Sequence, residues 1–201
     1  MKVVILAGGS GSRLGDITKI IPKPLVKIGK LPILAHIINI YLNYDIHEFI
    51  IALGYKGDKI VEYFLKQKVT KKVKNQLKKG LSIQIKLFNK NCKIVFVDTG
   101  KNTMTGGRVK RAARLVNEKN FYLTYGDGLS NVNIKELTKF HYKDKKIVTV
   151  TAVRPPARFG ELIIKNKKVI SFSEKKQMQT SWINGGFFII NKKFLKFLKN
   201  D

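Results

Sequence analysis

The chain has 201 residues, 44% of them hydrophobic, which suits one globular domain over residues 1–201. Its apolar runs are too short to cross a bilayer, and its start lacks a signal peptide, so we expect a cytoplasmic protein with no membrane partner. The formal net charge of +27 would suit a nucleic-acid partner. However, the lysines are spread along the chain, and the densest stretch, residues 66–79, has few aromatic residues on which bases could stack, so we expect no nucleic-acid partner.

Cysteine and histidine usage argues against a structural metal or a disulfide. Cys92 is the only cysteine, so no internal disulfide can form. The three histidines, His36, His47 and His141, lack the spacing of a zinc site. We therefore expect no structural metal.

The first two-thirds of the chain alternate between strand and helix patterns. Residues 3–7, Val-Val-Ile-Leu-Ala, are apolar throughout, as in a strand buried on both faces of a parallel sheet. Further strands are predicted at residues 48–53, 83–87, 94–97, 121–125 and 148–153, and helices around 33–42, 60–65, 106–116 and 134–140. This alternation requires right-handed crossovers and predicts an α/β fold, a Rossmann-like, mostly parallel sheet covered by helices on both faces.

After Pro155 and Pro156 the pattern changes to short strands with tight turns. Residues 161–164, 169–172 and 187–190 could form a small antiparallel extension at one sheet edge, before a final helix from Lys192. No linker or repeat separates this part, so one domain is expected. The chain ends at Asp201, within a turn of that last helix.

A glycine-rich loop follows the first strand directly. Residues 8–14 read Gly-Gly-Ser-Gly-Ser-Arg-Leu. Glycines allow a sharp turn and bring backbone N–H groups close to an anion, while Ser10 and Ser12 add hydroxyl donors and Arg13 adds a forked cation. This donor density indicates a loop that holds a triphosphate.

Two familiar phosphate loops do not match these residues. A dinucleotide fingerprint needs a third glycine where Leu14 stands, and a Walker loop needs a lysine directly after the last glycine. A glycine-rich turn that serves packing alone remains open.

Asp127 lies between two glycines directly after the predicted strand 121–125. Open α/β sheets bind their ligands at the carboxyl ends of strands, and a carboxylate there suits Mg²⁺ held against phosphate oxygens. A plain Asp-Gly turn would give the same letters. If the first strand is its neighbour, Asp127 and the glycine loop lie at the same edge.

Two further segments could contact such a ligand. Lys23 stands between Pro22 and Pro24, which fix the backbone and present the ammonium with little freedom; a plain proline turn is the alternative. Residues 103–108, Thr-Met-Thr-Gly-Gly-Arg, open a helix whose free N–H groups could receive a base or a sugar. Simple N-capping is the alternative there.

The order of these motifs resembles the sugar-1-phosphate nucleotidyltransferases. The resemblance covers essentially the whole chain and rests on the glycine loop, Pro22-Lys23-Pro24, Tyr125-Gly126-Asp127-Gly128 and Asn184-Gly185-Gly186-Phe187. Val97-Asp98-Thr99-Gly100, Met104-Thr105-Gly106-Gly107-Arg108 and Pro155-Pro156-Ala157-Arg158-Phe159-Gly160 are most similar to the cytidylyltransferase branch, which makes CDP-glucose.

The resemblance implies an ordered, Mg²⁺-dependent reaction of CTP with glucose 1-phosphate. A phosphate oxygen of the sugar phosphate attacks the α-phosphorus and pyrophosphate leaves, so catalysis consists of positioning and charge neutralisation. The product would serve deoxysugars of surface polysaccharide such as O-antigen. A homo-oligomer is expected.

The resemblance also assigns roles to residues. Arg13 would stabilise the leaving pyrophosphate, Lys23 the α-phosphate and sugar phosphate, and Asp127 would hold the metal. The nucleotide would be bound by Leu6, Ala7, Gly8, Gly9, Ser10, Gly11, Ser12, Arg13, Lys23, Thr103, Thr105, Gly107, Arg108 and Gly126. The glucose and its phosphate would face Gly160, Glu174, Lys175, Asn184 and Gly185.

The sequence departs from the family pattern at a few positions. Ser12 replaces a threonine and keeps its hydroxyl, and Lys176 replaces a proline. Family members also continue past Asp201 and supply a second metal-binding aspartate, so we expect that this chain lacks their C-terminal segment. Two alternatives stay open: a nucleotidyltransferase with another nucleotide or sugar phosphate, such as UTP or dTTP, and a non-catalytic protein that binds nucleotide or nucleic acid.

Overall fold

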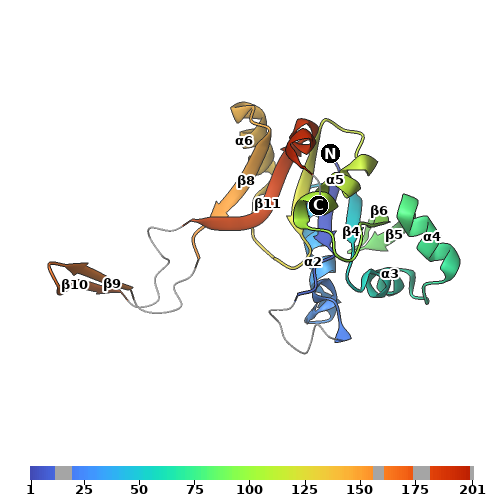
Figure 1. The fold of residues 1–201 in the computed structure, drawn as a ribbon, viewed down its shortest axis with the longest axis horizontal. Helices are drawn as coiled ribbons and strands as arrows, with labels where there is room; N and C mark the ends of the chain where they lie inside the picture. Colours follow the sequence, from blue (N-terminus) through green and yellow to red (C-terminus); the bar gives the residue numbers. More distant parts are fainter. Residues whose placement is uncertain (12–19, 156–160, 174–181, 200–201) are drawn as a thin grey trace.

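A mixed seven-stranded sheet forms the centre of the molecule in the computed structural model, which describes residues 1–11, 20–155, 161–173 and 182–199 (Figure 1). The strand order is β5-β6-β4-β1-β7-β11-β8. The strands are β5 (Leu81–Leu87), β6 (Lys90–Asp98), β4 (Glu48–Leu53), β1 (Val3–Ala7), β7 (Asn120–Tyr125), β11 (Ile183–Asn191) and β8 (Val148–Val153). This sheet confirms the expected α/β class.

The centre of the sheet is parallel and its flanks are antiparallel. Strand β1 pairs in parallel with both β4 and β7, and β4 pairs in parallel with β6. Strand β5 runs against β6, and β11 runs against both β7 and β8. Since β11 lies inside the main sheet, the predicted strand at 187–190 is part of the central architecture and not of a separate extension.

Helices cover both faces of this sheet. The helical segments are α2 (Ile33–Leu42), α3 (Gly57–Leu65), α4 (Lys71–Lys79), α5 (Thr105–Ala112), α6 (Ile134–Asp144) and the 3₁₀ helices η2 (Lys23–Leu25), η3 (Ala113–Leu115) and η4 (Lys192–Phe197). One core cluster joins α2, α3, α4 and α6 to residues such as Val3 and Ile5. The other joins α5, η3 and η4 to residues such as Val4. Successive β1 side chains thus enter opposite cores, which explains its continuous apolar sequence.

Helix α4 was not predicted, because its sequence is dominated by lysine. Thr70 caps it by accepting a hydrogen bond from the Val73 backbone N–H at 3.3 Å. Leu77 is buried and Val73 packs beside the same core, so a two-residue apolar stripe fixes the helix. The basic stretch is therefore a solvated helix face. The final helix predicted from Lys192 is a 3₁₀ helix, η4 (Lys192–Phe197).

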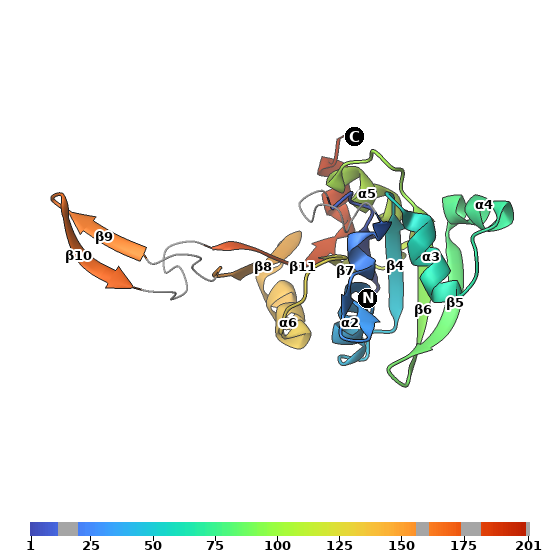
Figure 2. The ribbon, with the colours of Figure 1, turned by 90° about the horizontal axis from the view of Figure 1, so that it is seen from below.

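A small hairpin lies outside the main sheet. Strands β9 (Glu161–Lys165) and β10 (Lys168–Ser173) pair antiparallel with each other and stand apart from the other strands in both ribbon views (Figure 2). This hairpin is the predicted antiparallel extension, reduced to two strands. A second short pair joins β2 (Lys27–Ile28) to β3 (Leu31–Pro32).

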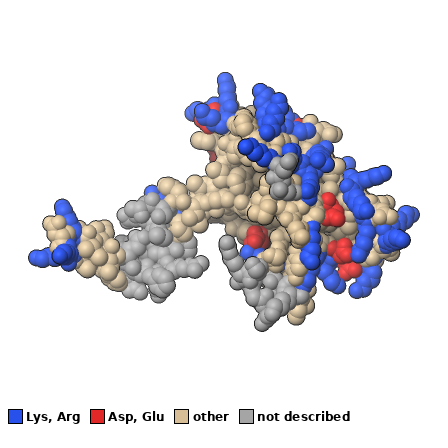
Figure 3. Space-filling view, in the orientation of Figure 1, with Lys and Arg blue, Asp and Glu red and all other residues tan. Residues whose placement is uncertain are grey.

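Basic side chains are distributed broadly over the visible surface. Figure 3 shows Lys and Arg over most of the main body on this face and again at the hairpin tip, with few acidic side chains between them. No single basic patch dominates this face. Among the described residues, every helix is too short or too polar to span a bilayer.

His141 couples α6 to β8 and yields a pH prediction. Its Nδ1 lies 2.8 Å from Thr149 Oγ1, the residue is 3% exposed, and burial lowers the pKa of His141 more than the Asp144 carboxylate raises it. The unfolded chain therefore protonates His141 more readily than the folded chain does. The contribution of neutral His141 to the free energy of unfolding is complete above the unfolded pKa of about 6.5, and it decreases as the pH falls below that value.

We expect the free energy of unfolding of the wild-type chain to fall between pH 7 and pH 5.5 more steeply than that of His141→Gln, because glutamine does not titrate. Urea unfolding at both pH values, followed by circular dichroism, measures this difference. Equal pH dependence in the two chains would contradict the assignment.

Candidate active site

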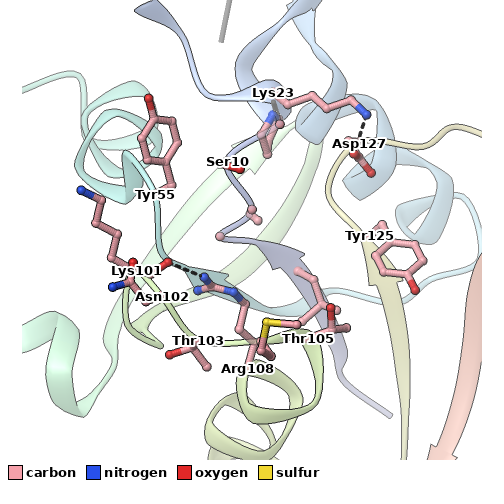
Figure 4. A pocket seen from close by; sticks show the side chains of 17 residues that line it. Ser10, Lys23, Tyr55, Lys101, Asn102, Thr103, Thr105, Arg108, Tyr125 and Asp127 are labelled. Carbon is pink, nitrogen blue, oxygen red and sulfur yellow. Dashed lines mark hydrogen bonds and ion pairs between the residues drawn. The ribbon is translucent and has the colours of Figure 1, made fainter. Parts of the chain in front are cut away.

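A cavity of about 410 Å³ opens where β1, β4, β6 and β7 end (Figure 4). Four loops and the first turns of α5 and η2 form its walls. It is lined by Leu6, Ala7, Gly8, Gly9, Ser10, Gly11, Lys23, Pro24, Tyr55, Lys101, Asn102, Thr103, Met104, Thr105, Arg108, Tyr125 and Asp127. Since parallel strands bring their carboxyl ends to one edge, segments more than 100 residues apart meet here.

The glycine loop forms one wall of the cavity. Contacts with neighbouring protein atoms explain some of the glycines around this wall but not others. A Cβ on Gly8 would lie 2.9 Å from the Gly54 nitrogen and closer still to Arg108, and a Cβ on Gly126 would lie 2.9 Å from the Leu6 carbonyl oxygen. Gly9, by contrast, is exposed and has no atom within 4 Å of its Cβ position. Packing explains Gly8 and Gly126 but not Gly9, which leaves room for a ligand close to the backbone.

Lys23 and Asp127 meet across the cavity. The Lys23 Nζ lies 2.7 Å from Asp127 Oδ2, with the two side chains 30% and 38% exposed (Figure 4). Lys23 starts η2 directly after Pro22, while the buried Pro24 anchors the turn. The predicted cation and the predicted metal-binding carboxylate thus form one ion pair that solvent and a ligand can reach.

The start of α5 closes the opposite side. Its N-cap residue, Met104, makes no side-chain capping bond. The neighbouring Thr103 hydroxyl instead accepts a hydrogen bond from Arg111 Nη1, so simple N-capping by Thr103 does not explain this segment. The first turn of α5 leaves backbone N–H groups near Thr103, Met104 and Thr105, a position that favours anionic or polar ligand atoms.

Arg108 lies at the floor of the cavity. It is 6% exposed, and its guanidinium donates to the carbonyl oxygens of Leu53, Gly100 and Lys101 and to the Thr99 hydroxyl. The Arg108 guanidinium lies among backbone carbonyl groups as well as beside the cavity. The role of Arg108 in nucleotide binding therefore stays a prediction.

The structure brings most predicted nucleotide residues together and leaves others at the margin. Gly107 and Gly126 do not line the cavity, although Gly126 N donates to Leu6 O at 2.9 Å and so joins β7 to β1. Asn184 does not line the cavity itself, but its Nδ2 donates to the hydroxyl of the cavity-lining Tyr125 at 3.3 Å. Gly185 packs on β8, where its Cβ would lie 2.9 Å from Val153 Cγ1. The predicted Ser12, Arg13, Gly160, Glu174 and Lys175 lie outside the described residues.

Tyr55, Lys101 and Asn102 line the cavity but were not among the predicted site residues. Tyr55 follows β4, and its N–H donates to the Gly8 carbonyl at 3.0 Å. Lys101 and Asn102 follow β6. They carry no recognisable motif, and only their place after neighbouring parallel strands could have indicated them.

The donor set suits a magnesium ion that arrives with phosphates. Within the described ranges, no group of three or more His, Cys, Asp or Glu side chains is arranged to hold a metal. Asp127 offers one cavity-facing carboxylate. Mg²⁺ often binds one or two carboxylates and takes its remaining ligands from substrate phosphates and water, so the residues fit this ion.

Comparisons with known proteins identify the family of the chain. A family profile described as nucleotidyl transferase matches residues 2–201. A Bacillus subtilis protein named probable glucose-1-phosphate cytidylyltransferase is 40% identical over 201 residues, which cover 100% of this chain and 79% of the relative. The Salmonella typhimurium glucose-1-phosphate cytidylyltransferase is 42% identical over 207 residues, with the same coverage.

Solved structures agree as well. The crystal structure of HddC from Yersinia pseudotuberculosis superposes with a TM-score of 0.68 at 27% identity, covering 98% of this chain and 79% of that one. The matches span the sheet and the cavity and confirm the resemblance drawn from the motifs. The chain is a nucleotidyltransferase enzyme and belongs to the nucleotidyl transferase family.

Proposed function

We propose that the chain transfers a cytidylyl group from CTP to α-D-glucose 1-phosphate, giving CDP-glucose and pyrophosphate with Mg²⁺ as cofactor. The observation that carries this proposal is the Lys23–Asp127 pair, 2.7 Å apart, beside an open glycine loop. A cation, a carboxylate and bare N–H groups around one cavity match a metal-bound triphosphate. The relatives named glucose-1-phosphate cytidylyltransferase support the choice of base and sugar.

The reaction needs no protein nucleophile. A phosphate oxygen of glucose 1-phosphate forms a bond to the α-phosphorus of CTP, and the bond from that phosphorus to the bridging oxygen of the β-phosphate breaks. The electron pair leaves with pyrophosphate. The protein therefore acts by holding the two phosphates in line and by neutralising charge.

Each cavity wall has a part in this scheme. N–H groups of the glycine loop hold the β- and γ-phosphates, and Lys23 turns from Asp127 towards the α-phosphate and the sugar phosphate. Asp127 holds Mg²⁺, which supplies positive charge to the phosphate oxygens when bound. Arg13 is proposed to stabilise the leaving pyrophosphate. The segment 103–108 binds the base or the ribose.

The sugar phosphate is proposed to enter from the side of Tyr125 and Asn184. Their hydrogen bond at 3.3 Å joins β7 to β11 at the rim of the cavity. We propose that Gly160, Glu174 and Lys175 complete this side, with Glu174 accepting from sugar hydroxyls and Lys175 meeting the phosphate. CDP-glucose made in the cytoplasm would then serve surface polysaccharide synthesis.

A different base is the strongest alternative. The D-glycero-alpha-D-manno-heptose 1-phosphate guanylyltransferase of Aneurinibacillus thermoaerophilus is 33% identical over 196 residues. The higher identity of the cytidylyltransferases favours CTP. A nucleic-acid-binding role has less support, since basic residues are spread over the visible face of the main body (Figure 3).

We further propose that the chain forms a homo-oligomer through the β9–β10 hairpin. Its apolar side chains are exposed on both faces, with Leu162, Ile163, Ile164, Val169, Ile170 and Phe172 each 53–62% exposed. Contiguous exposed apolar side chains of this kind are typical of a protein–protein contact surface. A second copy carries the same surface, so two hairpins can bury each other.

The substrate assay tests the proposed function. Purified protein with Mg²⁺ and glucose 1-phosphate is expected to release pyrophosphate with CTP at least about tenfold faster than with UTP, dTTP, GTP or ATP, because the base segment is proposed to select cytosine. A coupled pyrophosphate assay, with product masses determined, measures this. Preference for another nucleotide would contradict the choice of base, and no turnover from folded protein would contradict the reaction.

Replacing Asp127 tests the metal assignment. Asp127→Asn keeps the shape but loses the charge, so kcat is expected to fall by at least about 100-fold, or about 2.7 kcal/mol of barrier. The melting temperature should stay close to that of the wild-type chain. Asp45→Asn, at an exposed carboxylate paired with Lys90 at 3.5 Å, is the matched control. Near-normal turnover by Asp127→Asn would refute the assignment.

Light scattering after gel filtration tests the oligomer. The wild-type chain is expected to elute as an assembly at micromolar concentration, and the double variant Ile163→Ser/Phe172→Ser as a monomer with unchanged far-UV circular dichroism. Phe197→Ser, at a 68% exposed residue of η4, is the control and should remain assembled. A monomeric wild-type chain, or an assembled double variant, would contradict the proposal.

A further inference from the structure

A second cavity, of about 510 Å³, lies at the edge of the sheet opposite the active-site cavity. It opens where β1, β7 and β8 begin and where β11 ends, whereas the active-site cavity lies where β1 and β7 end. It is lined by Met1, Glu118, Lys119, Asn120, His141, Tyr142, Lys145, Lys146 and Asn191. The two cavities share no lining residue, so a ligand bound here would lie apart from the reaction.

Two polar side chains that line this cavity are almost completely buried. Asn120 is 7% exposed and His141 is 3% exposed. Asn120 Oδ1 accepts a hydrogen bond from Asn191 Nδ2 at 2.7 Å, and His141 Nδ1 lies 2.8 Å from Thr149 Oγ1. Within the described part of the chain, Asn120 Nδ2 and His141 Nε2 have no hydrogen-bond partner. Since buried polar atoms are normally paired, these two nitrogens point to a ligand in the cavity.

Both nitrogens can act as hydrogen-bond donors. Asn120 Nδ2 carries two hydrogens. Burial lowers the pKa of His141, so its imidazole is neutral at pH 7.5. In the neutral tautomer whose Nδ1 accepts from the Thr149 hydroxyl, Nε2 carries the hydrogen. The ligand that these donors suit is therefore one that offers acceptor oxygens.

The side chains around these donors are mostly positive. Three exposed lysines line the cavity: Lys119, Lys145 and Lys146. Glu118 also lines it, but its carboxylate accepts from the Asn117 N–H at 3.1 Å and lies 3.9 Å from Lys2 Nζ, which offsets its charge. The carbonyls that end α6 would repel an anion, and the Lys145 N–H caps one of them, the His141 oxygen, at 3.1 Å. The balance of charge favours an anionic ligand.

We propose that this cavity binds the phosphate group of a small organic phosphate. The two buried nitrogens donate to phosphate oxygens, and the lysines supply the opposite charge. Inorganic phosphate would leave most of the 510 Å³ empty, because cavities of about 300–1,000 Å³ accommodate drug-sized molecules. The ring of Tyr142, a 55% exposed residue, offers an apolar surface to the organic part. The site does not depend on the proposed function, since it uses none of the residues of the active-site cavity.

The imidazole of His141 is a local reporter of this site. The chain has three histidines, so the variant His141→Gln identifies the Cε1–H signal of His141 in the proton NMR spectrum. At pH 7.5 and constant ionic strength, the wild-type chain is titrated with inorganic phosphate, glucose 1-phosphate and CMP. At least one organic phosphate is expected to shift the His141 signal saturably, with a Kd of about 1 mM or below and at least about threefold tighter than inorganic phosphate. The signals of His36 and His47, which do not line the cavity, should stay constant.

Two matched double variants test the role of the lysines. Lys145→Gln/Lys146→Gln is expected to raise the Kd at least about tenfold, because it removes two charges beside the phosphate. Lys139→Gln/Lys143→Gln removes the same net charge from α6 outside this cavity and should bind within about twofold of the wild-type chain. Both variants change exposed side chains and should keep the far-UV circular dichroism and the pyrophosphate release of the wild-type chain.

Three outcomes would overturn the inference. If neither organic phosphate shifts the His141 signal saturably, the cavity does not bind them. Equal weakening in the two double variants would mean that net charge alone attracts the anion. If neither organic phosphate binds more tightly than inorganic phosphate, the organic part of the ligand is not recognised and the proposed ligand class is wrong.

Discussion

Strand β1 lies at the centre of the sheet with both edges paired in parallel, to β4 and to β7, and this arrangement places the cavity. Parallel neighbours cannot be joined by tight turns, so each is reached through a helical crossover that returns the chain to the same side. The loops after β1, β4, β6 and β7 consequently open at one edge. The side chains at this edge come from distant parts of the sequence, and the order and direction of the strands are sufficient to bring them together.

The ion pair at this edge of the sheet is only weakly stabilising. Lys23 and Asp127 form a short ion pair, but both side chains are about one-third exposed, and an ion pair in contact with water contributes only about 0–1 kcal/mol. Such a pair can separate readily when stronger partners arrive. A phosphate is a stronger partner for the lysine, and a divalent cation is a stronger partner for the carboxylate. The ion pair therefore holds both side chains in the cavity but can be replaced by contacts with a ligand.

The parts that could be predicted from the sequence are those with a local cause. Residues 48–53 form the predicted strand because all but the first are buried, and α2 covers the predicted 33–42 because its apolar spacing matches its buried face. The place of β11 inside the sheet could not be predicted, because its pairing with β7 depends on residues more than 60 positions away. Helix α4 depends on a stripe of two residues, and Tyr55 and Lys101 enter the site through strand order alone.

The glycines around the cavity show how one loop serves both the fold and the ligand. Gly8, Gly54 and Gly126 are required by neighbouring protein atoms, since a side chain at each would collide with backbone or with Arg108. Gly9 has no such neighbour. A loop selected only for packing would be free to carry a side chain at that position, where it would cost nothing in the fold. Its absence leaves bare backbone facing the cavity, next to a residue that packing holds rigidly in place, and rigid, exposed N–H groups are what binding of a phosphate requires.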